Sequence, residues 1–296
     1  MMFKKVALLA LCASTLIGAK PAPPPSTSNP EIAYVNISGG SRRHYQLRVA
    51  NEDGTGAATL YSSRDVGQMM PHMGPAADRT IVLIQGGRVS LVRYNVSSTG
   101  TTFHSIEPLF TINTAVGAQR VDFSPNGKDI VWWDRPINTL KIFNLDTRTS
   151  RSLIQLASEP HNFAFNRDGT AVLFLDHVTD SDAILKSVPL AGGDATEVGL
   201  RGDFWGVESA HGSDALILTR GVNHKTSQLE YYATPASGPD NLATGYVPSI
   251  KCDDSTAIYQ QVNADGSVSL LRVDLASGAG FTTSTKGNYW PDYVGC

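Results

Sequence analysis

The hydrophobic pattern of the chain consists of short apolar runs separated by turn residues. In its clearest unit, Val121 and Phe123 alternate with polar residues, a Ser-Pro-Asn-Gly turn follows at 124–127, and an uninterrupted apolar run starts at Ile130. Alternation predicts a strand with one buried face, and the short run of β-branched and aromatic residues predicts a strand covered on both faces. Proline presets φ in the turn and glycine accepts positive φ. A third strand is expected from Thr139.

Variants of this unit recur along the chain at a spacing of about 45 residues. The hairpins formed by the third and fourth strands of the units are expected at 45–61, 89–103, 139–154, 184–198, 229–242 and 270–283. About 45 residues with four strands per unit is the size of a propeller blade. We therefore predict an all-β, six-bladed β-propeller, with seven blades or a β-sandwich as the alternatives.

The two ends of the repeat pattern complement each other. Residues 31–36 resemble a second strand with no first strand before it, and residues 289–294 resemble a first strand with no second strand after it. We expect the C-terminal strand to complete the N-terminal blade, because closure removes the open sheet edges that promote aggregation. Cys252 and Cys296 then fall at nearly equivalent positions in neighbouring blades. A disulfide between them would join these blades, and two free buried thiols are the alternative.

Residues 1–19 are expected to be a secretory signal peptide. Two lysines precede a mostly apolar run that is too short to span a bilayer, and we favour cleavage near Ala19. Cys12 raises the alternative of a lipoprotein. We disfavour lipidation there, because the position before a lipidated cysteine takes a small residue and Leu11 is large.

The remaining chain divides into a tether and one domain. Residues 20–30 are rich in proline and form a tether, and residues 31–296 are expected to form a single propeller. No later run is apolar and long enough to span a membrane. The full sequence has a formal net charge of −3 and no blocks of like charge, and this argues against nucleic acid or an anionic membrane as partner. We expect a periplasmic or secreted protein whose partner is another envelope protein, a peptide or a glycan.

The repeat resembles that of a known family. Residues 121–130 followed by 140–146, and residues 32–36 followed by 51–56, are similar to the WD40-like repeat of TolB-type β-propellers, whose strands are linked by a Ser-Pro-Asp-Gly turn. The resemblance extends from about residue 31 to the C-terminus. TolB carries an N-terminal α/β domain that we do not expect in this chain, so the chain looks TolB-like without being TolB itself. The family implies an envelope or periplasmic binding scaffold, and it also includes propellers attached to peptidases and some sugar-processing enzymes.

Two groups of side chains are expected at the face of the ring where the first strands begin. The first group would surround the mouth of the central channel, where it could stack on a sugar or hold a peptide end. It comprises His72, Gln119, His161, Trp205 and Trp290. The alternative for the two tryptophans is packing between adjacent blades. The second group lies in longer loops, where it could receive carboxylate or phosphate groups unless it is ordinary solvated charge. It comprises Arg42, Arg43, His44, Arg135, Arg220, His224 and Lys225.

Motifs for catalysis or metal binding are not evident. The sequence has no Gly-x-Ser-x-Gly elbow, no His-Glu-x-x-His motif and no P-loop. Carboxylates from distant blades could converge in the channel, but spacing alone cannot reveal this. A weak cation candidate differs from an EF-hand in its spacing; it comprises Asp176, His177, Asp180 and Asp182. We therefore expect no metal and no cofactor.

These observations favour an exported TolB-like propeller that acts as a non-catalytic binding scaffold in the periplasm or cell envelope. The alternative is a propeller enzyme, either a glycan lyase or hydrolase or a peptidase-like protein, that uses polar residues at the central channel. A purely structural envelope component is a third possibility. Carboxylates that meet across the channel, or a histidine-bound metal, would favour the enzyme. A channel mouth lined only by tryptophan and apolar residues would favour the scaffold.

Overall fold

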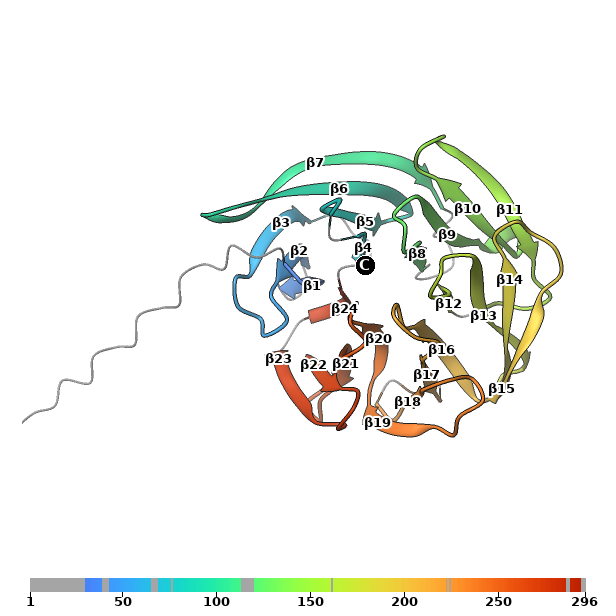
Figure 1. Cartoon of the computed structure of the whole chain (residues 1–296). Helices are drawn as coiled ribbons and strands as arrows, with labels where there is room; N and C mark the ends of the chain where they lie inside the picture. Colours follow the sequence, from blue (N-terminus) through green and yellow to red (C-terminus); the bar gives the residue numbers. More distant parts are fainter. Residues whose placement is uncertain are drawn as a thin grey trace, which may run out of the picture.

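The computed structural model describes residues 30–38, 43–64, 69–75, 77–112, 120–160, 162–221, 223, 225–285 and 288–293, with the side chains of 284, 285 and 288–290 left out. These residues form six four-stranded antiparallel sheets arranged as blades around a common axis (Figure 1). The prediction of a six-bladed propeller is therefore confirmed. The predicted signal peptide and nearly all of the tether lie outside the described residues.

The first three blades each run outward from an innermost strand at the axis. From this strand outward, blade 1 contains β24 (Asn288–Tyr293), β1 (Ile32–Ser38), β2 (His44–Ala50) and β3 (Ala58–Ser63). Blade 2 contains β4 (Met69–Met73), β5 (Thr80–Gln85), β6 (Arg88–Ser97) and β7 (Gly100–Thr111). Blade 3 contains β8 (Val121–Phe123), β9 (Asp129–Asp134), β10 (Thr139–Asn144) and β11 (Thr149–Gln155), with the short 3-10 helix η1 (Arg135–Ile137) after β9.

The other three blades follow the same order. Blade 4 contains β12 (Phe163–Phe165), β13 (Ala171–Thr179), β14 (Asp182–Pro189) and β15 (Thr196–Gly202). Blade 5 contains β16 (Phe204–Ser209), β17 (Leu216–Arg220), β18 (Gln228–Tyr232) and β19 (Asp240–Thr244). Blade 6 contains β20 (Tyr246–Ile250), β21 (Thr256–Val262), β22 (Val268–Asp274) and β23 (Gly280–Thr285).

Ring closure occurs as the ends of the sequence predict. Strand β24 pairs antiparallel with β1, with Ile32 opposite Tyr293 and Ala33 opposite Asp292. The C-terminal strand is thus the innermost strand of the N-terminal blade. Cys252 lies in the turn between β20 and β21, whereas Cys296 lies outside the described residues. The disulfide between them therefore stays a prediction.

The apolar core lies between adjacent blades. Between blades 3 and 4, Val131 and Leu140 pack in one buried cluster with Phe163 and Phe174. Each fully buried side chain of this kind contributes roughly 1.5–3 kcal/mol to stability. Because residues alternate between the two faces of a strand, residues that flank the packed positions of the inner strands can point to the axis.

Strand β7 is longer than the sequence pattern predicts. We expected this strand to end near residue 103, but it continues to Thr111 and includes Pro108. A proline donates no hydrogen bond, so it is tolerated in an outermost strand whose outer edge is unpaired. The pairing with β6 shifts register between Val89 and Ser90, opposite Phe110 and Pro108, as expected of a bulge.

Candidate functional site

Each innermost strand pairs antiparallel with the next strand outward, so in every blade the innermost strand begins at the end where the second strand leads into the third. The first residues of these strands therefore lie toward one face of the ring, together with the connections between second and third strands, such as residues 135–138. We call this the loop face. The opposite turn face carries the turns between first and second strands, such as residues 124–127. The central channel is the axial region that the inner strands enclose (Figure 1).

Charged side chains from alternate blades meet in this channel. The Nη2 atom of Arg120, the residue just before β8, donates a hydrogen bond of 2.6 Å to Oε2 of Glu208 in β16. Strand β12 lies between β8 and β16, so the ion pair reaches across the channel from blade 3 to blade 5. Asp122 of β8 and Asp292 of β24 interact electrostatically with both partners. We call Arg120, Asp122, Glu208 and Asp292 the channel cluster.

Two carboxylates of the cluster connect neighbouring blades. Asp122 accepts a 2.7 Å hydrogen bond from the backbone N–H of Phe165 in blade 4. Asp292 accepts a 2.6 Å hydrogen bond from the backbone N–H of Met73 in blade 2 and a 2.7 Å hydrogen bond from the Ser249 hydroxyl in blade 6. These carboxylates therefore satisfy backbone and hydroxyl donors that would otherwise be buried without partners.

Glu208 differs from the two aspartates. Among the described residues, Arg120 is the one group that donates a hydrogen bond to its carboxylate. Burial, together with the negative charges of Asp122 and Asp292, raises the pKa of Glu208 to about 8 despite the adjacent guanidinium. Burial likewise raises the pKa of Asp292 to about 7 and raises that of Asp122. These carboxyl groups interact electrostatically, so their protons are released in steps that belong to the group and not to single residues.

Two histidines face the cluster without adding charge to it. His72 of β4 has its Nδ1 atom 3.9 Å from Oδ2 of Asp292, and its side chain is 12% exposed. Burial lowers its pKa well below the usual range. His211, just after β16, interacts with Asp122, and burial lowers its pKa as well. Both imidazoles are therefore neutral at pH 7.

The remaining residues predicted at the mouth are only partly described. Trp205 donates from Nε1 to Asp203 at 2.8 Å, and its ring lies 5.1 Å from the His177 ring of blade 4. This contact is the interblade packing that the sequence left open as the alternative for Trp205. His72 lies deeper, against the channel cluster. Gln119, His161 and the side chain of Trp290 lie outside the described residues.

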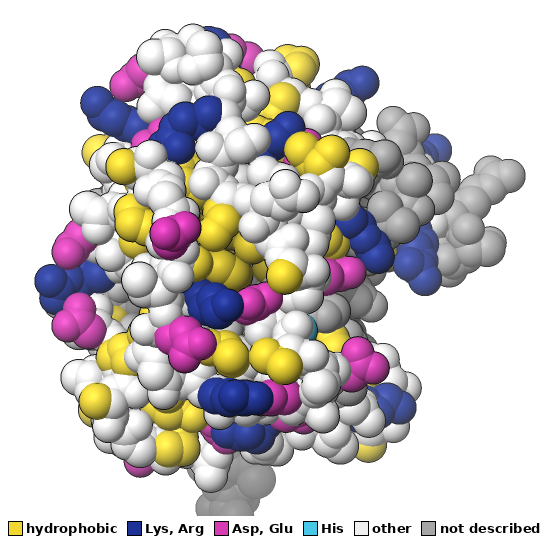
Figure 2. Space-filling view, turned by 90° about the vertical axis from the view of Figure 1, so that its right-hand side faces the viewer, with side chains coloured by type: hydrophobic (Ala, Val, Ile, Leu, Met, Phe, Trp, Pro, Cys, Tyr) yellow, Lys and Arg dark blue, Asp and Glu magenta, His cyan; other side chains and the backbone are white. Residues whose placement is uncertain are grey.

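The predicted loop group is spread around the ring. Arg43 and His44 lie in blade 1, Arg135 in blade 3, and Arg220 and Lys225 in blade 5. Arg135 lies 3.4 Å from Glu159, and the guanidinium of Arg220 pairs with Glu230. Arg42 and His224 lie outside the described residues. On the part of the surface that Figure 2 faces, positive and negative side chains are also interspersed.

The candidate cation loop has its carboxylates turned to nearby protein groups. Asp176 accepts a 2.6 Å hydrogen bond from the Lys186 Nζ atom and a 2.9 Å hydrogen bond from the Ser158 hydroxyl. Asp182 pairs with the guanidinium of Arg201. Within the described ranges, no group of three or more His, Cys, Asp or Glu residues could hold a metal ion.

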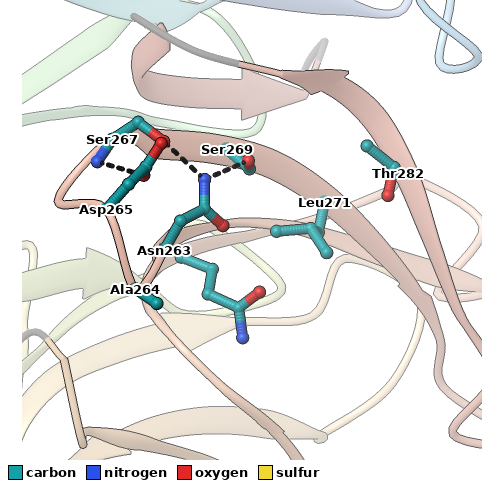
Figure 3. Close-up of a pocket in the computed structure, with 8 residues that line it drawn as sticks. Asn263, Ala264, Asp265, Ser267, Ser269, Leu271 and Thr282 are labelled. Atoms are coloured by element: carbon teal, nitrogen blue, oxygen red, sulfur yellow. Dashed lines mark hydrogen bonds between the residues drawn. The ribbon is translucent and has the colours of Figure 1, made fainter.

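A shallow pocket lies at the loop face of blade 6 (Figure 3). It is an open depression of about 500 Å³ around the connection between β21 and β22. The Asn263 amide donates to the hydroxyls of Ser267 at 2.9 Å and Ser269 at 2.8 Å. These groups satisfy one another, as the dashed lines in Figure 3 show, and none of the lining residues belongs to the channel cluster.

The channel cluster is not among the sites predicted from the sequence. A weak signal existed, because Asp122 and Asp292 each precede an aromatic residue in a first strand, and Glu208 stands in the first strand of a third unit. A search for acidic residues in the inner strands would have found all three.

The described part of the chain contains no helix that is long and apolar enough to cross a membrane.

Comparison with known proteins shows the fold. No protein-family model and no curated protein sequence matches the chain. TolB from Acinetobacter baumannii is similar over 90% of this chain and 66% of that chain, with a TM-score of 0.69 and 16% identity. A chain of the nidogen/laminin complex is similar over 89% of this chain and 98% of that chain, with a TM-score of 0.63 and 13% identity. The chain thus has the fold of a TolB-like six-bladed β-propeller.

Proposed function

We propose that this chain is an exported, non-catalytic scaffold of the periplasm or cell envelope that binds another envelope protein or a peptide at the loop face. The fold supports this proposal, because it is shared with TolB and with a propeller solved in a nidogen/laminin complex. The proposed leader, residues 1–19, would deliver the chain to that compartment. Mass determination of the exported protein would test cleavage near Ala19.

The observation that carries the proposal is the way the channel carboxylates are used. Carboxylates that meet across the channel were expected to favour an enzyme, and such carboxylates are present. However, Asp122 and Asp292 accept hydrogen bonds from Phe165, Met73 and Ser249 of other blades, so their oxygens hold the ring together. This leaves Glu208, and a single carboxyl group cannot form the pair of acidic residues that glycoside hydrolysis requires. The loop face is therefore the surface we assign to a partner.

Site-specific photocross-linking in cells of the source organism would test this assignment. A benzophenone side chain in place of Arg43 samples the loop face, and one in place of Asp168 samples the turn face. Both positions are exposed. We expect the same discrete adduct from Arg43 and from a second loop-face position, Lys225, and none from Asp168. Adducts formed equally from both faces, or from Asp168 alone, would contradict the proposal.

The propeller enzyme stays as a second candidate because of Glu208. A buried carboxyl group that keeps its proton near neutral pH, beside a guanidinium, is suited to general acid catalysis. Incubation with peptidoglycan fragments, oligosaccharides and peptides, followed by mass spectrometry, would test it. Turnover by the wild type that is lost in Glu208→Gln would replace the scaffold proposal. Product formation by neither protein would leave the scaffold ahead.

A further inference from the structure

The channel cluster holds more negative than positive charge. Its three carboxyl groups, Asp122, Glu208 and Asp292, face the single guanidinium of Arg120. The nearest imidazoles, His72 and His211, are neutral. With every carboxyl ionised, the cluster would carry an excess of two negative charges in a region with little access to water. Buried charge without compensation is costly, so the protein gains stability by binding protons there.

We propose that the channel cluster is a proton-dependent latch, which holds the ring from inside when its excess carboxyl groups are protonated and loosens it when Glu208 and Asp292 both ionise. This device is separate from partner binding at the loop face. Its role is to set how firmly the inner strands of blades 1, 3 and 5 are held across the channel.

The contacts of the cluster explain why its charge state would act on the whole ring. Asp292 joins blade 1 to blade 2 through Met73 and to blade 6 through Ser249. Asp122 joins blade 3 to blade 4, and the pair of Arg120 with Glu208 joins blade 3 to blade 5. Repulsion between carboxylates pushes apart the same side chains that make these contacts.

Among the described residues, charged and titratable groups lie around Glu208 on several neighbouring elements. Strand β8 and the residue before it supply Asp122 and Arg120, and β24 supplies Asp292. His72 of β4 lies against Asp292. On the turn face, His211 interacts with Asp122 and with Asp254 of the β20–β21 turn. None of these groups supplies a second full positive charge at pH 7.

The sign of the pH effect follows from the direction of the shifts. The pKa of Glu208 in the folded chain is about 8 and that of Asp292 about 7, whereas carboxyl groups in the unfolded chain titrate at about 4. Between these limits the folded state binds more protons than the unfolded state. Folding stability is therefore greatest near the acid end of this window and falls as pH rises through 7 and 8.

The experiment compares thermal unfolding of the full chain between pH 5.5 and 9 for wild type, Glu208→Gln and Glu197→Gln. Glu197 is exposed on β15 and serves as the matched control. We expect Tm of the wild type and of the control to fall by several degrees from pH 6 to 9. Glu208→Gln should show a clearly shallower fall and the higher Tm at pH 9. Parallel profiles for wild type and Glu208→Gln would overturn the proposal.

A second measurement needs no variant. A titration of the wild-type side-chain carboxyl carbons by 13C NMR should show at least one group with a midpoint above pH 6.5. A titration in which every carboxyl group has its midpoint below pH 6 would overturn the proposal even if Glu208→Gln fails to fold. Loss of partner cross-links at the loop face would leave these two results unchanged, so this inference and the proposed function fail separately.

Discussion

Arg120 and Glu208 form an ion pair of 2.6 Å between blades 3 and 5, with blade 4 between them. Their side chains are 17% and 11% exposed, so little water competes for the contact. Most contacts between blades join neighbours around the ring, whereas this one reaches across the axis. The centre of the propeller is consequently joined by hydrogen bonds between polar and titratable groups, and its apolar core lies between the blades.

Loss of Arg120 should destabilise the protein in a pH-dependent manner. Arg120→Gln leaves Asp122, Glu208 and Asp292 without a cation, which we expect to cost about 3–5 kcal/mol at pH 8, as for other broken buried pairs. The cost should be smaller at pH 5.5, where more of the carboxyl groups are protonated. Urea unfolding at both pH values measures the difference.

An exposed arginine provides the control for this variant. Arg93 pairs with Glu107 on blade 2, and its side chain is 40% exposed. Arg93→Gln should change the unfolding free energy by less than about 1 kcal/mol at either pH. Equal losses for the two variants, or a loss for Arg120→Gln that does not depend on pH, would show that the channel charges are not coupled as described.

Gly127 should resist substitution more strongly than a glycine of similar backbone conformation. Its φ is +69°, and a Cβ there would lie 2.7 Å from Asp78 Oδ2 and 2.9 Å from Pro75 Cγ. Gly266 has φ +80° but open space around it. Because strain in φ is common to both, Gly127→Ala should lose about 1–3 kcal/mol more than Gly266→Ala, owing to the clash. Similar losses of unfolding free energy in the two variants would mean that the turn at Gly127 shifts enough to make room for the added Cβ.

The architecture was predictable because its signals are local. The Ser-Pro-Asn-Gly turn at 124–127 forms as expected, with the Gly127 N–H donating to the Ser124 carbonyl oxygen at 2.9 Å. The sequence pattern has a second strand without a first at residues 31–36 and a first strand without a second at 289–294. It therefore predicts that the two segments share one blade, and β1 does pair with β24. Turn chemistry and two-residue alternation depend on neighbours in sequence, so one chain is enough to reveal them.

The channel cluster was not predictable in the same way. Arg120 and Glu208 stand 88 residues apart, and they meet only because the ring brings inner strands of different blades to one axis. Neither residue interrupts its local strand pattern. Trp205 was expected at the channel mouth from its place early in a first strand, and its contact with His177 of the preceding blade depends on blade packing. Such contacts follow from the closed fold and leave no mark on the spacing of residues.

Cys252→Ser should lower thermal stability under non-reducing conditions if the predicted bond to Cys296 forms. A disulfide that closes a loop of this length contributes about 2–4 kcal/mol in the entropic account. Addition of a reductant should lower Tm of the wild type to that of the variant. Equal Tm values without reductant would remove the disulfide from the explanation of ring closure.

The seam between blades 6 and 1 has a second support in Glu52, which is buried in the turn between β2 and β3. Its carboxylate accepts a 2.6 Å hydrogen bond from Lys251 Nζ and forms an ion pair with Arg272 of β22. Its backbone carbonyl oxygen accepts a hydrogen bond from the Thr283 hydroxyl. Glu52→Gln removes the charge from two cations of the neighbouring blade. Since Glu31 still lies 3.4 Å from Lys251, we expect a loss of about 2–3 kcal/mol, which is less than the roughly 3–5 kcal/mol found for broken buried pairs.

Salt dependence distinguishes this seam from simple packing. In Glu52→Gln the unfolding free energy should respond less to added NaCl than in wild type, because screening acts on the attraction that the variant lacks. Glu197→Gln, on the exposed face of β15, should follow the wild type in both stability and salt response. A Glu52→Gln protein as stable as the control would mean that pairing of β24 with β1 closes the ring without help from these charges.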